Sequence, residues 1–322
     1  MSSHTTEAEA KAAVRKLGGL SWKQLSKRLW TKFNDDDVLN RAAILSYYFL
    51  LALFPLLLFL TALLGYFAEA GTELRRNLLT YLGRVVPISA FDLINATVDE
   101  ISRNSGGGKL SFGLLTALWF ASSGMGAIIE ALNIAYGVRE SRTWWKRTLL
   151  AVVLTIALAA FIITALALML YGNRIAEGVA SSYRFGEPFT TTWKIAQWFI
   201  VFIFVLLAFA LIYYFAPDLR EQKWYWMMPG AIVGVVLWLL ISFLFSLYLG
   251  YFNTYSVTYG SLGAMIILML WFYLTGAAII VGGEVNSVIE HAAARAGTPH
   301  AKLPGEKAPD QGGKAQAAGA SP

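Results

Sequence analysis

The residues most able to do chemistry in this sequence are ionisable side chains that end long apolar stretches. Glu130 follows about twenty uncharged residues, and Glu284 ends a later uncharged stretch in the same way. With a rise of about 1.5 Å per helical residue, both carboxylates are predicted to lie near one boundary of a bilayer. Ionisable groups there are costly and usually have a partner. We expect them to pair with Arg41 and the arginines of residues 139–147, either as a gate or as interface charges that hold helix ends together.

Further polar and small residues lie within or beside the apolar stretches. Polar side chains in a membrane span usually face other helices or a cavity. The residues expected along a substrate path or gate are Arg41, Ser46, Tyr47, Tyr48, Pro55, Glu130, Asn133, Tyr136, Arg139, Tyr259, Glu284 and Asn286. For Tyr259, an aromatic belt at the membrane interface is the competing interpretation. Gly230 and Gly234 have a GxxxG spacing, which predicts close packing between helices.

The sequence offers little for an enzyme, a metal ion or a cofactor. It has no cysteine, which excludes disulfides, thiolate zinc sites and a cysteine nucleophile. Its three histidines, at positions 4, 291 and 300, are predicted to lie in polar terminal tails. We therefore predict no metal site, no cofactor and no enzymatic activity.

An acidic run at residues 35–37 is the one feature that could hold a divalent cation. It directly precedes a predicted helix, where Asn34 can cap the N-terminus and carboxylates in the first turn suit the helix dipole. We favour the cap. Hydrolysis of RNA would need paired metals or a positioned acid and base, and the sequence predicts neither.

The elements that must position these residues are membrane spans. Of the residues 57% are hydrophobic and 14% charged, against about 25% charged in soluble domains. Mean hydropathy is +0.55, and long uncharged windows alternate with short basic clusters. Each window is long enough for a helix to cross a bilayer. We predict an all-α polytopic membrane protein, a bundle of about six transmembrane helices with amphipathic helices on both membrane faces. The predicted spans are residues 42–68, 110–136, 148–172, 195–216, 226–250 and 260–284.

The flanking segments are more polar than the spans. Residues 20–33 place Trp22, Leu25, Leu29 and Phe33 at helical spacing, which is typical of an interfacial amphipathic helix; a plain juxtamembrane basic segment with no anchoring role is the equal alternative. Two amphipathic helices are predicted in the outer connection, within residues 72–103. Residues 1–19 and 291–322 are predicted to be disordered tails, leaving 34–290 as the transmembrane domain.

The distribution of basic residues predicts the orientation. With both termini inside, the inner segments hold 18 lysines and arginines and the outer segments 8. This asymmetry satisfies the positive-inside rule. We expect a multi-pass protein of the bacterial inner (plasma) membrane with cytoplasmic termini. The basic segments are expected to meet anionic lipid headgroups, and no nucleic-acid partner is expected; the oligomeric state stays open.

Three stretches together resemble the YihY/BrkB family of bacterial inner-membrane proteins. They are SYYFLLALFPLLLFL at 46–60, Ala135-Tyr136-Gly137 before a basic run, and TYGSLGAMIILMLWFYLTGAAIIVGGEVN at 258–286. The resemblance covers about residues 20–290 and implies six transmembrane helices and a link to the cell envelope. The ribonuclease name sometimes given to the family does not fit these residues.

Two functions from different classes are consistent with the sequence. The first is a transporter or flippase-like protein for a lipid-like or small envelope-related substrate. The alternative is a non-transporting scaffold or regulator of envelope integrity. A continuous polar cavity would favour transport, whereas tight Gly/Ala packing would favour a scaffold.

Overall fold

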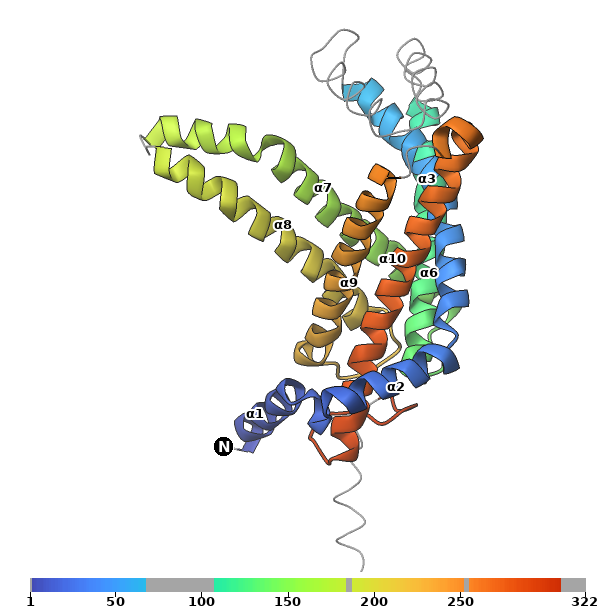
Figure 1. The fold of residues 1–322 in the computed structure, drawn as a ribbon, viewed down its shortest axis with the longest axis vertical. Helices are drawn as coiled ribbons and strands as arrows, with labels where there is room; N and C mark the ends of the chain where they lie inside the picture. Colours follow the sequence, from blue (N-terminus) through green and yellow to red (C-terminus); the bar gives the residue numbers. More distant parts are fainter. Residues whose placement is uncertain (1, 68–106, 184–186, 252–254, 308–322) are drawn as a thin grey trace, which may run out of the picture. The chain divides into compact units, whose positions relative to one another are not determined.

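The described part of the chain is built from helices. In this computed structural model it comprises residues 2–67, 107–183, 187–251 and 255–307 (Figure 1). Every regular element within these ranges is a helix. The predicted all-α fold class is therefore confirmed.

Long apolar helices make up most of these ranges. Five are long and apolar enough to cross a membrane, and they overlap five of the six predicted windows. They are α6 (Gly107–Ala135), α7 (Trp144–Tyr183), α8 (Glu187–Phe215), α9 (Trp224–Tyr251) and α10 (Tyr255–Arg295). The remaining window coincides with α3 (Val38–Phe67), whose described apolar stretch, Val38–Leu53, is shorter. The count of six spans stays a prediction, and the predicted outer helices of residues 72–103 lie outside the described residues.

The contacts within the chain define two compact units. The first contains Met1–Leu39, Ile128–Trp238 and Ala278–Pro322, and the second contains Asn40–Ala127 and Leu239–Ala277. Within the first unit, α7 and α8 lie side by side (Figure 1). The first unit also holds most of the described charged side chains.

In the first unit α9 and α10 pack closely at a proline. Pro229 lies inside α9, where a residue without an N–H interrupts the helical hydrogen bonds. The buried Asn286 amide of α10 accepts from the Gly230 N–H at 2.6 Å and donates to the Met227 carbonyl at 3.1 Å. A Cβ at Gly230 would lie 2.0 Å from the Gly282 carbonyl oxygen. The Asn286 side chain thus bonds two backbone groups of α9 beside the proline, and such bonds are favoured in apolar surroundings.

Tyr213 of α8 completes this packing. Its buried hydroxyl donates to the Ile279 carbonyl of α10 at 2.8 Å. A Cβ at Gly234 would lie 2.7 Å from the same hydroxyl, and one at Gly282 only 2.1 Å. The glycines therefore let three helices meet at close range.

The second unit is held by aromatic and small side chains. Phe49 of α3 and Phe272 of α10 have ring centroids 5.7 Å apart in an edge-on arrangement. A Cβ at Gly276 would lie 3.1 Å from that of Leu45, and one at Gly124 of α6 would lie 3.4 Å from that of Tyr48. Residues of α3 thus pack against both α6 and α10.

The amphipathic helix expected at residues 20–33 is α2 (Trp22–Asp35). It begins at a capping box, in which the Ser21 hydroxyl accepts from the Gln24 N–H and the Gln24 side chain accepts from the Ser21 N–H. Leu25 is buried, whereas Trp22 is 76% and Trp30 69% exposed. Large exposed indoles of this kind are typical of helices that lie at a membrane surface.

The chain ends are more ordered than the sequence predicts. Ser2–Arg15 form α1 where a disordered tail was expected, because the segment is rich in helix-forming residues and contains an i,i+4 ion pair between Glu7 and Lys11 at 3.1 Å. A short helical turn, η1 (Leu17–Gly19), follows it. Gly18 adopts φ +67°, and a Cβ there would lie 2.4 Å from the Ile289 carbonyl oxygen of α10.

The C-terminal tail also differs from its prediction. α10 continues to Arg295, and the residues after it pack against the first unit, with Lys302 1% exposed. The expected tail of residues 291–322 is therefore ordered over its described part, residues 291–307. In this segment Lys302 lies 3.1 Å from the buried Glu290 carboxylate of α10.

Candidate functional site

A charged cluster joins α2 to α10 in the first unit. The Lys32 ammonium of α2 donates to Glu284 Oε2 at 2.8 Å and to the Ser287 hydroxyl at 3.1 Å. It also donates to the Ala135 carbonyl at the end of α6 and lies 3.1 Å from Asp36 Oδ2. We call Lys32, Asp36 and Glu284 the latch cluster. One ammonium with three N–H donors thus faces four acceptors.

The latch cluster is incompletely satisfied. Glu284 is 2% exposed, and its Oε1 is buried without a hydrogen-bond partner among the described residues. A buried polar atom without a partner costs about 1–3 kcal/mol, and more when it is charged. Two carboxylates also share one cation here. The cluster therefore carries more negative than positive charge.

A second ion pair is fully buried near the end of α10. Lys302 Nζ lies 3.1 Å from Glu290 Oε1, and the two side chains are 1% and 0% exposed. The neighbouring Tyr136 hydroxyl donates to the Met227 sulfur at 3.6 Å, and the Tyr136 ring meets His291 edge-on at 6.2 Å. His291 is 6% exposed, so the prediction that it lies in a polar tail was wrong. The segment following α10 folds back and buries it.

A third group of charges joins the loops that follow α6 and α8. Arg142 contacts both oxygens of Glu140 at 2.7 Å, and it donates to the Ala216 carbonyl at 2.8 Å. The Asn133 amide donates to Glu140 at 2.9 Å. Partial burial raises the pKa of Glu140, but the hydrogen bonds and charge of Arg142 outweigh burial and lower it.

Asp218 lies at the centre of the same loops. Its Oδ2 accepts from the Ser141 N–H at 2.8 Å and the Ser141 hydroxyl at 2.6 Å, and it also accepts from Lys307. Its own N–H donates to Asn133 at 2.7 Å. Burial raises the pKa of Asp218, but the hydrogen bonds from Lys307 and Ser141 outweigh it and bring the pKa to about 2. The carboxylate is therefore ionised at neutral pH.

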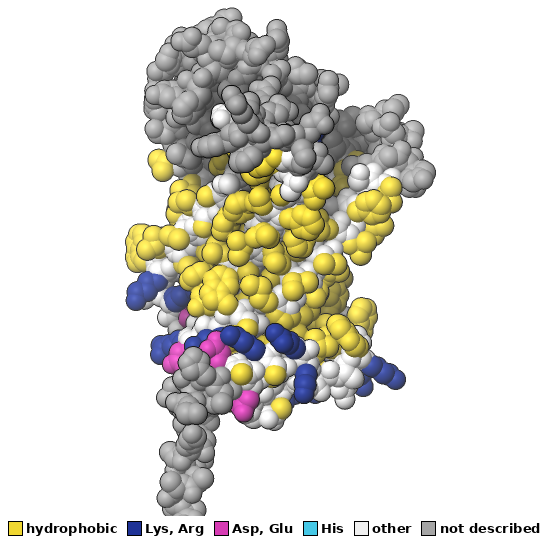
Figure 2. All heavy atoms as spheres, turned by 90° about the vertical axis from the view of Figure 1, so that its left-hand side faces the viewer, with side chains coloured by type: hydrophobic (Ala, Val, Ile, Leu, Met, Phe, Trp, Pro, Cys, Tyr) yellow, Lys and Arg dark blue, Asp and Glu magenta, His cyan; other side chains and the backbone are white. Residues whose placement is uncertain are grey.

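The remaining predicted carboxylate is in a different environment. Glu130 Oε2 lies 3.3 Å from the Arg147 guanidinium, and the side chains are 61% and 32% exposed. Figure 2 shows basic and acidic side chains gathered in one band of the visible face, with hydrophobic side chains beyond it. Among the described residues, no three His, Asp or Glu side chains are grouped so as to hold a metal ion.

Sequence comparisons identify the family. The family described as virulence factor BrkB matches residues 29–305, which is most of the chain. This chain belongs to the BrkB family. A relative in Bacillus subtilis (strain 168), YfkH, whose name describes it as ribonuclease-like, is 36% identical over 82% of this chain and 94% of its own length.

Other relatives of the BrkB-family chain carry only a membrane-protein name. A UPF0761 membrane protein of Xanthomonas campestris pv. campestris (strain B100) is 26% identical over 80% of this chain, and one of Xanthomonas axonopodis pv. citri (strain 306) is 25% identical. The match covers 59% of the length of these Xanthomonas proteins. No solved structure matches. The comparisons and the long apolar helices identify a membrane protein of the BrkB family.

The structure places the two predicted carboxylates with different partners. Glu130 pairs with an arginine of residues 139–147, as expected. The expected arginine partner of Glu284 was wrong, because α2 packs on α10 and brings Lys32 there instead. Asn133 accepts from the Asp218 N–H, and Asn286 accepts from the Gly230 N–H. The Arg139 side chain is exposed.

Other predicted residues lie elsewhere in the chain. The second unit contains Arg41, Ser46, Tyr47 and Tyr48. The Ser46 side chain is buried and donates to the Ala43 carbonyl, whereas the Tyr47 side chain is exposed. The side chains of Pro55 and Tyr259 lie outside the described residues. The capping role for Asn34 was wrong, because α2 continues through it and its amide donates to the Trp30 carbonyl.

The sequence analysis did not single out Lys32, Asp218 or Lys302, and it placed Asp36 at a helix N-terminus. Lys32 and Asp36 stand four residues apart near a helix end, a spacing that favours an ion pair and could have revealed this one. Lys302 gave no such signal, since it lies in a segment rich in Ala, Gly and Pro.

Proposed function

We propose that this protein moves a lipid-like or small envelope-related substrate across the membrane, and that the latch cluster opens and closes during the cycle. The observation that carries this proposal is the buried Glu284 oxygen without a partner, beside an ammonium shared by two carboxylates. If the cluster only had to hold α2 in place, its stability would be greater with every buried oxygen hydrogen-bonded. An unsatisfied buried charge is instead expected where a second arrangement satisfies it.

The position of the cluster supports a gating role. It joins a surface helix, α2, to the charged end of α10, whose stretch Met265–Arg295 is a candidate membrane span. Ionisable residues in such spans usually belong to substrate or ion pathways. We propose that uptake of a proton or a cation by Glu284 releases Lys32 and thereby α2. Energy would come from an ion gradient or the substrate's own gradient.

A scaffold or regulator of envelope integrity is the alternative function. The exposed Trp22 and Trp30 of α2 offer a surface for a lipid or protein partner, which this alternative would use.

Under either function we propose that the chain has no enzymatic activity of its own. Purified protein is then expected to leave RNA intact with or without divalent metal.

The transport proposal can be tested in proteoliposomes. The wild type should move a headgroup-labelled anionic lipid or a small solute between compartments, and Lys32→Gln should change the rate several-fold. Lys27→Gln, an exposed lysine of the same helix, is the matched control and should behave as the wild type. If the wild type moves nothing while Lys32→Gln still fails to rescue a deletion strain, the scaffold function is favoured.

We also propose that both termini face the cytoplasm at the inner membrane. The excess of basic residues in the segments flanking the spans supports this orientation. Reporter fusions after residues 142 and 290 should register inside, and fusions after residues 108 and 185 outside. A reversed pattern would overturn both the orientation and the path assigned to Glu284.

A further inference from the structure

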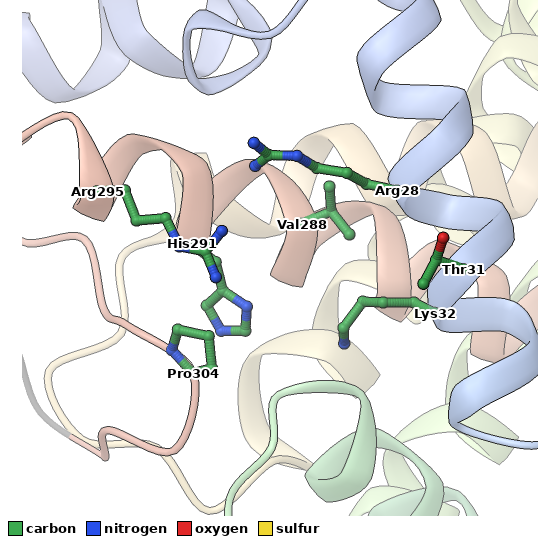
Figure 3. Close-up of a pocket in the computed structure, with 7 residues that line it drawn as sticks. All are labelled: Arg28, Thr31, Lys32, Val288, His291, Arg295 and Pro304. Carbon is green, nitrogen blue, oxygen red and sulfur yellow. The ribbon is translucent and has the colours of Figure 1, made fainter.

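A small basic pocket lies beside the latch cluster, between α2 and the end of α10. It has a volume of about 200 Å³ and is lined by Arg28, Thr31, Lys32, Val288, His291, Arg295 and Pro304. Figure 3 shows that Arg28 reaches from α2 towards the α10 side chains His291 and Arg295, with Pro304 of the following segment alongside. The pocket is thus formed by three separate parts of the first unit.

Only one of the three basic side chains named in this pocket's lining is balanced by carboxylates. Lys32 is engaged with Glu284 and Asp36. Within the described part of the chain, neither Arg28 nor Arg295 forms an ion pair. Guanidinium groups bind phosphate through paired, charge-assisted hydrogen bonds. Two such groups facing one small pocket therefore favour an anion with several oxygens.

The surroundings of the pocket indicate where such an anion comes from. Arg28 shares α2 with the exposed Trp22 and Trp30, a pattern typical of a helix at the membrane interface. Val288 and Pro304 add apolar lining next to the charges. Since a water molecule takes about 30 Å³, the pocket is large enough for a phosphate with a small glycerol group but not for a nucleic-acid duplex.

We infer that this pocket binds the phosphate of an anionic membrane lipid between Arg28 and Arg295. The C-terminus of α10 itself carries negative partial charge, so the attraction must come from the guanidinium groups. A simpler role for Arg295 is to complement that helix dipole, but this role does not require Arg28. The lipid site is independent of transport and would serve a scaffold equally.

The site can be tested with the full-length protein in a neutral detergent, by native mass spectrometry and by melting. Short-chain phosphatidylglycerol is the probe, and short-chain phosphatidylcholine and inorganic phosphate are the comparison ligands. The wild type should bind one phosphatidylglycerol in preference to phosphatidylcholine. The double variant Arg28→Gln/Arg295→Gln should bind it at least tenfold more weakly, since each guanidinium contributes separately. Arg28→Gln alone should lose several-fold.

The matched control is Lys23→Gln/Lys27→Gln, which removes two exposed charges from α2 outside the pocket. It should bind within twofold of the wild type. If both glutamine double variants lost the same affinity for phosphatidylglycerol, general charge attraction would explain the binding and the pocket would not be a specific site. Inorganic phosphate binding as tightly as phosphatidylglycerol would overturn the lipid as occupant. The double variant Arg28→Gln/Arg295→Gln should have the same melting temperature as the wild type, which shows that it is folded. Arg28→Lys/Arg295→Lys should restore part of the affinity for phosphatidylglycerol.

Discussion

Two carboxylates that look equivalent in the sequence occupy opposite environments in the structure. Glu130 and Glu284 both end long apolar stretches, yet Glu130 is 61% exposed and Glu284 only 2%. Glu130 contacts one arginine in the adjoining helix, α7. Glu284 contacts a lysine that α2 brings from far away in the sequence. Depth along a helix therefore predicts which charges lie near a boundary, but the packing of a surface helix decides which one is buried.

This difference determines the energetics of each ion pair. An exposed pair contributes about 0–1 kcal/mol, because water screens it and two side chains must be ordered. Removing one partner of a buried pair costs about 3–5 kcal/mol, because the other charge is left without water or a counter-charge. In the latch cluster Lys32 has several acceptors, so the loss of one of them should cost much less than breaking a buried pair.

The largest effect is expected at the fully buried pair of Glu290 and Lys302. Lys302→Met leaves Glu290 buried without its cation, which should cost about 3–5 kcal/mol and lower the melting temperature by about 6–10 °C. Thermal unfolding in detergent measures this. The double variant Glu290→Leu/Lys302→Met removes both charges and should recover most of the loss. A double variant as unstable as Lys302→Met would show that apolar packing, not charge, was lost.

A smaller, pH-dependent effect is expected at Asp218. Its folded pKa of about 2 lies below the ordinary aspartate pKa of 3.8, so its ionised form stabilises the fold above pH 3.8. The contribution, about 2 kcal/mol, is lost as the pH falls from about 4 towards 2. Asp218→Asn should lower the melting temperature at pH 6 and approach the wild type near pH 2. A difference that does not change between pH 6 and pH 2 would contradict this assignment.

The smallest effect is expected at the exposed pair. Glu130→Gln should change the free energy of unfolding by no more than about 1 kcal/mol, because Arg147 remains hydrated. Its melting temperature should lie within about 2 °C of the wild type, and rescue of a deletion strain should be complete. A clear loss of rescue would show that Glu130 has a role which its exposure does not suggest.

The sequence predicted the helical architecture well and the charge partners poorly. Apolar windows and basic flanks gave the long helices, and the spacing of Trp22, Leu25 and Phe33 gave the surface helix α2. These features are local, so periodicity reveals them. Gly230 and Gly234, singled out by their GxxxG spacing, lie at contacts with α10 and α8 respectively.

The pairing of Lys32 with Glu284 joins residues 252 positions apart, and no local pattern encodes it. The same holds for Lys302, whose burial depends on the segment after α10 folding back. Asp36 was interpreted as part of a helix N-terminus, because three consecutive acids suit a helix dipole. It instead lies just past the C-terminus of α2, where Lys32 is one turn away.

Glu284→Gln distinguishes a latch cluster that opens and closes from one that only holds α2 in place. After this change Lys32 still contacts Asp36, Ser287 and the Ala135 carbonyl, so the fold should keep most of its stability. If the cluster is a gate, it should nevertheless stop opening and closing, because the glutamine amide at position 284 cannot gain or lose a proton as the carboxylate does.

The measurement combines melting in detergent with rescue of a deletion strain, using Glu130→Gln as the matched control. We predict that Glu284→Gln melts within about 2 °C of the wild type but rescues poorly. If the cluster only holds α2 in place, the variant should instead lose about 3–5 kcal/mol of stability, which lowers the melting temperature by about 6–10 °C, and it should also fail to rescue. A variant that melts normally and rescues fully would show that the latch cluster is not a gate.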